Sequence, residues 1–171
     1  MKYTISVLVE NRAGVLSKIT GLFSRRAFNI DSLAVGTTED RTMSRITMVV
    51  DDNKNSTVEQ VEKQLNKLVE VIKVRTYTQE ELISKELMIV KVSANQRTRS
   101  DIMNVCEIMG AKISDLSATT MTLELADTPD RVDLFADLLR PFSIIELVRT
   151  GMIALQKGSG VISAKGNGKQ Q

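Results

Sequence analysis

One order of strands and helices is predicted twice along this chain of 171 residues. Residues 3–9 alternate between apolar and polar side chains, which is typical of a half-buried strand, and residues 15–23 carry apolar side chains at helical spacing. The patterns that follow predict two strands, a helix and a closing strand at residues 30–35, 46–50, 58–68 and 71–77. The resulting order β-α-β-β-α-β is that of a ferredoxin-like unit.

The same order returns in the second half of the chain. Strands are predicted at residues 87–92, 113–117, 121–125 and 144–149, the last with room to extend to residue 154, and helices at residues 102–109 and 129–139. Gly110 suits the C-terminus of the first of these helices, and Thr128 with Pro129 suits the N-terminus of the second. We therefore predict an α+β fold of two tandem ferredoxin-like βαββαβ domains with antiparallel sheets.

A short polar joint near residues 78–84 separates the two predicted domains. The N-terminal domain is expected at residues 1–78 and the C-terminal domain at residues 79–156, while residues 157–171, rich in Gly and Lys, are expected to form a flexible tail. In such a unit both helices cover one face of the sheet, so a single small domain buries little apolar surface. Pairing with a second copy would bury more, and a homodimer is expected on that ground.

The chain lacks the residue types that several functions require. It has no His, no Trp and a single cysteine, Cys106. It therefore lacks the side chain most often used in acid–base catalysis, and it can form neither an intrachain disulfide nor a Cys-pair zinc site. A net charge of +2 and 4% aromatic residues argue against nucleic-acid binding. No apolar run approaches the roughly 20 residues of a membrane span, and no targeting segment is visible, so a cytoplasmic location, or the plastid stroma, is expected.

The most informative segment is the first strand-to-helix turn, residues 10–16. Gly14 lets backbone amides approach a ligand, and the helix start supplies unpaired N–H groups and partial positive charge that suit a carboxylate. Asn11 offers an acceptor for an ammonium group and a donor for a carboxylate. Asn29, which follows the same helix, can act likewise from a neighbouring chain. A small zwitterion is the ligand that these groups match.

Spacing alone leaves a second interpretation of this turn open. Asn and Gly occur in many turns only because they suit the backbone geometry. The equivalent turn of the second repeat, residues 95–100, has no Gly. If the first turn binds a ligand, the second is expected to have lost that ability.

Several stretches of the chain resemble one known family, the small regulatory subunits of acetolactate synthase (acetohydroxyacid synthase), which contain ACT domains. The resemblance is carried by residues 8–16, 21–33, 44–50, 85–92 and 146–151. It implies a tandem pair of ACT and ACT-like domains in a non-catalytic subunit of branched-chain amino-acid (valine, leucine and isoleucine) biosynthesis. Such a subunit is expected to stimulate the large catalytic subunit and to confer feedback inhibition by valine.

The resemblance also implies a binding site and a division of cofactors. Valine is expected at the interface between the N-terminal domains of a homodimer, and the effector-site positions are Asn11, Gly14, Val15, Leu16, Asn29 and Ile30. Arg12 and Ala13 replace an acidic residue and a proline that are common in relatives, which predicts a less rigid loop. This chain is expected to bind no cofactor or metal, because thiamine diphosphate, Mg²⁺ and FAD belong to the catalytic partner.

Two other classes of function fit the repeat less well. RNA-recognition domains share the β-α-β-β-α-β order, but they place aromatic residues on central strands, where this chain has Val7, Val9 and Met48. A small mutase or acylphosphatase-like hydrolase would need a nucleophile–base pair, and none is evident. Cys106 lies on an apolar helical stripe and is expected in the core. The Asp51–Asp52 pair is expected to be a turn rather than a metal site.

Overall fold

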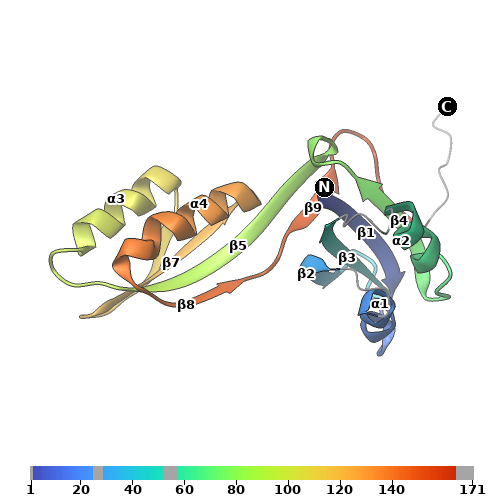
Figure 1. Ribbon diagram of the computed structural model, residues 1–171, viewed down its shortest axis with the longest axis horizontal. Coiled ribbons are helices and arrows are strands. Elements are labelled where there is room, and N and C mark those ends of the chain that lie inside the picture. The colour runs from blue at the N-terminus through green and yellow to red at the C-terminus, as the bar shows by residue number, and fades with distance from the viewer. Residues whose placement is uncertain (1, 25–28, 52–57, 165–171) are drawn as a thin grey trace. The chain divides into compact units, whose positions relative to one another are not determined.

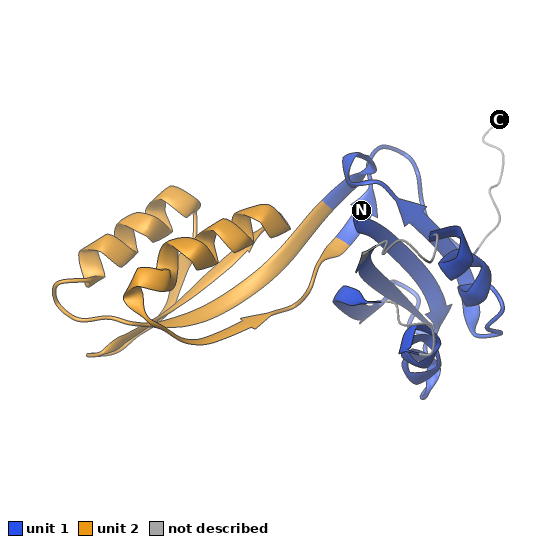
Figure 2. Cartoon of the chain, in the orientation of Figure 1, with its two compact units in different colours: residues 1–83, 154–171 blue, residues 84–153 orange. Residues whose placement is uncertain are grey.

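The computed structural model describes residues 2–24, 29–51 and 58–164. The chain divides into two compact units, Met1–Ile83 with Ala154–Gln171 and Ser84–Ile153, which Figure 2 colours separately. Each unit contains an antiparallel sheet with two helices on one of its faces. The predicted α+β class and the repeated ferredoxin-like order are confirmed.

The sheet of the first unit has the strand order β2-β3-β1-β4. Its elements are β1 (Lys2–Glu10), α1 (Val15–Ser24), β2 (Ile30–Thr37), β3 (Met43–Asp51), α2 (Val58–Leu65) and β4 (Val71–Tyr77). Alternate residues of β1 face the helices, and Ile5 and Val7 are fully buried there with Ile19 of α1. The apolar side chains that alternate along β1 therefore pack against the apolar face of α1 in one core.

The second unit repeats this arrangement with the order β6-β7-β5-β8. Its elements are β5 (Leu82–Ser93), α3 (Arg99–Met109), β6 (Lys112–Leu116), β7 (Thr120–Asp127), α4 (Pro129–Leu139) and β8 (Ile144–Arg149). Figure 1 shows α3 and α4 on the same side of β5, β7 and β8. Gly110 ends α3 in the left-handed conformation, with φ 73°, as predicted. Cys106 is 3% exposed and belongs to the core of this unit, which also confirms its expected role.

Several details differ from the sequence-based expectations; among the helices, α2 ends at Leu65 instead of residue 68 and α3 begins at Arg99 instead of residue 102. β5 begins at Leu82 instead of residue 87, directly after the 3₁₀ turn η1 (Gln79–Glu81), and it pairs with a strand from much later in the chain. β8 does not extend to residue 154, since Gly151 (φ 78°) follows it and a separate strand β9 (Ile153–Gln156) pairs with β5. The apolar stripe predicted for the helix at residues 129–139 includes Leu138 with Val132, Phe135 and Leu139, but Leu138 is 39% exposed at the margin of the buried stripe.

The helix-free face of the first sheet is also buried. Side chains on this face include Ser6 and Leu8 of β1, which are 1% and 3% exposed. Residues 154–164, which follow the second unit in the chain, lie against the first unit. The Lys157 amide donates to the Glu81 carbonyl over 2.8 Å, and Ile162 lines a pocket together with Leu8. These contacts attach residues 157–164, the described part of the expected tail, to the first unit.

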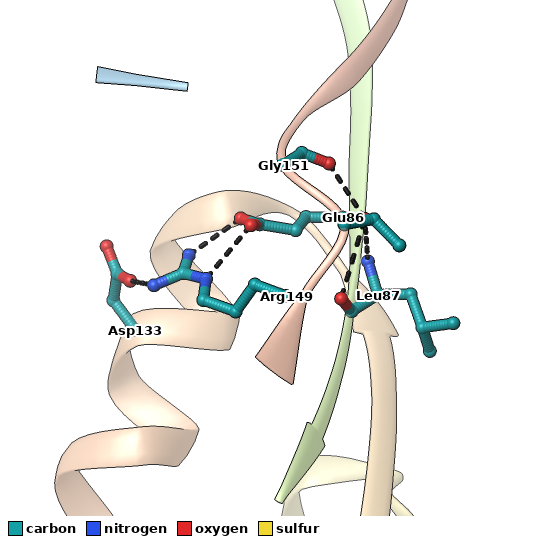
Figure 3. A network of polar contacts seen from close by, with 6 residues as sticks. Glu86, Leu87, Asp133, Arg149 and Gly151 are labelled. Atoms are coloured by element: carbon teal, nitrogen blue, oxygen red, sulfur yellow. Dashed lines mark hydrogen bonds and ion pairs between the residues drawn. The ribbon is translucent and has the colours of Figure 1, made fainter. Parts of the chain in front are cut away.

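A buried ion pair joins three elements of the second unit. Glu86 of β5 is 6% exposed and receives two hydrogen bonds from the Arg149 guanidinium of β8, at 2.9 and 2.6 Å. Figure 3 shows Asp133 of α4 on the other side of this guanidinium, and Arg149 donates to Asp133 over 2.6 Å.

None of the helices among the described residues is long and apolar enough to span a membrane.

Candidate functional site

The turn between β1 and α1 is fixed by the adjacent β2–β3 hairpin. The Asn11 amide donates to the Thr42 carbonyl over 2.7 Å, and its side-chain Nδ2 donates to the Arg41 carbonyl over 2.9 Å. The Oδ1 atom of Asn11 has no partner among the described residues and remains an acceptor. Gly14 has φ 85°, a left-handed conformation that favours Gly, and open space surrounds the position of an added Cβ.

The first turn of α1 leaves backbone donors free. Val15 donates to the Arg12 carbonyl and Lys18 to that of Gly14, but the amides of Leu16 and Ser17 find no acceptor within the described parts of the chain. No acidic residue lies in this first turn. Because free N–H groups and the helix dipole both favour negative charge, this helix start can accept a carboxylate.

Arg12 and Lys18, the cationic residues of the turn and of the first part of α1, already have partners. Arg12 Nε lies 3.0 Å from Glu10 Oε2, and Lys18 Nζ pairs with Glu70. The hydrogen bond from Lys18 lowers the pKa of Glu70, so this carboxylate stays charged near neutral pH. The attraction of the turn for an anion therefore comes from backbone amides more than from side-chain charge.

The other predicted effector positions divide between two ends of the unit. Ile30 begins β2 and lies opposite Val50, which in turn lies opposite Tyr3 at the start of β1. Asn11 follows the other end of β1, roughly 26 Å away at about 3.3 Å per residue. One chain therefore does not bring Asn29 and Ile30 to the same small ligand as Asn11.

Within these two groups the side chains differ in exposure. Val15 is 5% exposed and belongs to the core, whereas Leu16 is 40% exposed on the surface of α1. Asn29 is exposed, and its Nδ2 donates to Asp31 Oδ1 over 2.7 Å. Of the predicted positions, Asn11, Gly14 and Leu16 thus present groups to solvent at one end, and Asn29 does so at the other.

In the equivalent turn of the second unit, a side chain pairs with two of the backbone donors. Asn95 Oδ1 accepts hydrogen bonds from the amides of Arg97 and Thr98, at 2.9 and 3.1 Å. Asp101 also lies in the first turn of α3, where its charge complements the helix dipole. An added carboxylate would meet a like charge at this turn, which the first turn of α1 does not carry.

A pocket on the helix-free face of the first sheet was not identified from the sequence. It has a volume of about 160 Å³, and its lining includes Arg45 and Glu39 together with Leu8, Met43 and Ile162. In the alternating pattern of β3, a charged residue such as Arg45 is expected to face solvent. Arg45 is half-buried instead, because residues 162–164 lie close to it. No local signal in the sequence indicates that approach.

Two further expectations concern a metal site at the Asp51–Asp52 pair and the reactivity of Cys106. Among the described residues, no group of three or more His, Cys, Asp or Glu side chains is placed to hold a metal ion. Asp52, half of the acidic pair considered above, lies outside the described residues. Burial raises the pKa of the Cys106 thiol, which disfavours its reactive thiolate form.

Comparison with known proteins links both units to one family. Residues 5–73 match the AHAS small subunit-like ACT domain, and residues 85–158 match the family described as small subunit of acetolactate synthase. A probable acetolactate synthase small subunit of Archaeoglobus fulgidus is 46% identical over 93% of this chain and 99% of its own length. The acetolactate synthase small subunit of Mycolicibacterium smegmatis is 41% identical over 95% of each chain.

A solved structure agrees with these sequence relationships. The crystal structure of the acetolactate synthase small subunit from Thermotoga maritima superposes with a TM-score of 0.86 at 34% identity. The match covers 94% of this chain and 99% of that one, so both units and their order along the chain are included. The chain therefore belongs to the family of acetolactate synthase small subunits, and its first unit carries the ACT domain of that family.

Proposed function

We propose that this chain binds valine at the Asn11–Gly14 turn and thereby inhibits the large catalytic subunit of acetolactate synthase, which it otherwise stimulates. Family membership gives the chain a regulatory role in branched-chain amino-acid biosynthesis. The observation that carries the valine proposal is the turn itself, where the start of α1 has free amides and the Oδ1 of Asn11, a few residues earlier in the chain, is unused.

The groups of this turn match the two charges of an amino acid. The ligand carboxylate accepts hydrogen bonds from the amides of Leu16 and Ser17, and the ammonium group donates to Asn11 Oδ1. The exposed side chain of Leu16 offers an apolar surface for an aliphatic ligand. Effectors with micromolar to millimolar affinity need only about 8 to 4 kcal/mol of binding free energy, which a few such contacts supply.

A homodimer explains how the two ends of the unit act together. β2 is an edge strand of its sheet, and Val35 on it is 47% exposed. If two copies pair through β2 in antiparallel fashion, Ile30 of one copy lies near Thr37 of the other. That end of the sheet is the one that carries Asn11, since Thr37 pairs with Ser44 and Ser44 with Val9. Asn29 of one copy would then complete the valine site of the other.

The large catalytic subunit is the partner through which this binding acts. In this proposal thiamine diphosphate, Mg²⁺ and FAD are held by that partner, and the present chain binds none of them. A coupling free energy of roughly 1–3 kcal/mol between the valine site and the catalytic subunit would give about 5-fold to 150-fold control of activity.

Calorimetric titration with valine tests the proposal, with alanine and glutamate as ligand controls. Gly14→Asp places a negative charge beside the carboxylate position and is expected to abolish saturable valine binding. Because Gly14 has a positive φ, this variant also strains the backbone. Gly14→Asn is the matched control, since Asn has nearly the same shape, tolerates the left-handed conformation and carries no charge.

Two results would contradict the site assignment. One is valine binding to Gly14→Asp with wild-type affinity, and the other is equal loss of binding in Gly14→Asn and Gly14→Asp, which would indicate a backbone effect. Absence of binding by the wild-type chain would call for the same titration in the presence of the large subunit. Valine binding that appears only in that complex would place part of the site on the partner.

A further inference from the structure

Arg45 is a half-buried cation that has no carboxylate partner in the part of the chain that the structure describes. Its Nε atom donates to Ser6 Oγ over 2.8 Å, and Ser6 is 1% exposed. No Asp or Glu of the described residues lies within ion-pair distance of its guanidinium, although Glu39 is near enough to act on it through charge. Desolvation lowers the pKa of Arg45 from its ordinary value, and a guanidinium is not deprotonated in proteins. A partly desolvated guanidinium with free Nη groups favours an anionic ligand.

The surroundings of Arg45 form a small pocket of mixed chemistry. On the adjacent strands its neighbours are Leu8 and Gly36, and no atom lies within 4 Å of where a Cβ of Gly36 would stand. Glu39, on the hairpin after β2, bounds one side, while Met43 and Ile162 add apolar surface. The volume of about 160 Å³ is roughly that of five water molecules at about 30 Å³ each, which suits a short-chain molecule.

We propose that this pocket is a second ligand site, which takes a small aliphatic α-amino acid. The ligand carboxylate pairs with the Nη groups of Arg45, and its ammonium group lies toward Glu39. Its aliphatic side chain contacts Leu8, Met43 and Ile162, which fits the apolar part of the lining. The combination of one cation, one anion and an apolar surface distinguishes an amino acid from a simple carboxylate or amine.

This site is separate from the Asn11–Gly14 turn. Arg45 and Leu8 belong to the sheet face without helices, because their neighbours Ile46 and Val7 lie in the core against α1 and α2. The helix start that offers free amides lies on the opposite face. The pocket also depends on residues 162–164, which come from a part of the chain far from the turn in sequence.

Methyl NMR of the full-length chain can observe the two sites independently. Met43 and Ile162 report on the Arg45 pocket, whereas Leu16 and Ile30 report on the valine site proposed above. Three probes of similar shape are titrated: valine, its 2-oxo acid without the ammonium group, and isobutylamine without the carboxylate. Valine is expected to shift the Met43 and Ile162 methyl signals in a saturable way. The 2-oxo acid is expected to bind at least tenfold more weakly, and isobutylamine not detectably.

Three variants decide whether the named charges recognise the ligand. Arg45→Gln is expected to abolish the shifts at Met43 and Ile162, and Arg45→Lys to restore them in part. Glu39→Gln is expected to weaken valine binding at least fivefold while leaving that of the 2-oxo acid unchanged. Arg97→Gln, at an exposed position of the second unit, is the matched control and should bind as wild type.

The outcomes separate this proposal from the valine proposal. Shifts confined to Leu16 and Ile30 would overturn the second site and leave the first intact, while shifts confined to Met43 and Ile162 would support the second site alone. Retained shifts at Met43 in Arg45→Gln would also overturn it. If Arg45→Gln lost its folded spectrum, the exposed Glu39→Gln variant would decide, and unchanged valine binding in that variant would overturn the second site. Equal binding of valine and the 2-oxo acid by the wild type would overturn the assignment of the ligand as an amino acid.

Discussion

At the scale of single residues, the ion pair of Glu86 and Arg149 shows how a charge is accommodated in a small core. The Glu86 side chain is 7% exposed and that of Arg149 is 33% exposed, so water reaches the cation more readily than the anion. Two hydrogen bonds join the groups, and Arg149 also pairs with Asp133. The hydrogen bond with Glu86 raises the pKa of Arg149, which therefore stays charged at every pH at which the chain is folded. The buried carboxylate depends on this one guanidinium.

Removing the guanidinium should destabilise the second unit strongly. Arg149→Met leaves the Glu86 carboxylate buried without a partner, and we expect a loss of about 2–3 kcal/mol in the free energy of unfolding. The double variant Glu86→Leu with Arg149→Met removes both charges and should be more stable than Arg149→Met alone. Urea denaturation of both variants and of the wild type measures the difference. A double variant that is less stable than the single one would contradict this account.

At the scale of elements, the start of α4 shows how a helix N-terminus can be held without a side-chain cap. Thr128 occupies the N-cap position, but its side chain makes no capping hydrogen bond. Asp127 instead accepts a hydrogen bond from the Thr128 amide over 2.8 Å, and it pairs with Lys85 at 2.9 Å and with Arg131. These contacts attach the start of α4 to β5.

The Asp127 contacts predict a dependence of stability on acid pH. Hydrogen bonds from Lys85, Thr128 and Arg131 lower the pKa of Asp127 from 3.8 to about 2. A lowered pKa in the folded state contributes stability that is full above pH ~4 and is lost as pH falls toward 2. Because solvent reaches these pairs, the contribution is at most about 1 kcal/mol.

The Asp127→Asn variant tests this dependence. It should be less stable than the wild type at pH 7, and the difference should shrink steadily between pH 4 and pH 2. Thermal unfolding at several pH values measures both quantities. A difference that is constant over this range would show that the pKa of Asp127 is not lowered in the folded chain.

Elements with strong internal periodicity could be predicted from the sequence, and elements defined by distant contacts could not. The alternation in β1, the apolar stripe of α1 and the stop at Gly110 are local patterns, and the structure confirms them. The early start of β5 at Leu82 depends on pairing with β9, which lies some seventy residues later in the chain. The Asn11–Gly14 turn has a local signature, whereas the burial of Arg45 depends on residues 162–164 and has none.

At the scale of the whole molecule, two cores form from one chain without sharing a residue. The first core contains Phe23 and the second contains Phe135, and each of these side chains is at most 1% exposed. The chain leaves the first unit once, through β5, and returns to it through β9. Residues 154–164 thus belong to the first unit, although the whole second unit precedes them in sequence.

This order of the chain predicts an uneven effect of C-terminal truncation. A chain that ends at Lys157 lacks Ile162 and its neighbours, so Leu8 and Arg45 lose part of their cover on the helix-free face. Because burying one large aliphatic side chain contributes about 1.5–3 kcal/mol, the first unit should lose about 1–3 kcal/mol of stability. The second unit keeps every residue of its own core and should be unaffected.

Hydrogen exchange followed by mass spectrometry distinguishes the two units in the same sample. In the chain ending at Lys157, amides of β1 and β3 should exchange about 5-fold to 150-fold faster, while those of β5 and β7 keep their wild-type rates. A chain ending at Ala164 retains the residues that line the pocket and is the matched control, with wild-type exchange expected throughout. Unchanged rates in β1 and β3 after truncation at Lys157 would show that residues 158–164 do not stabilise the first sheet. Faster exchange in both units would instead show that the segment stabilises the chain as a whole.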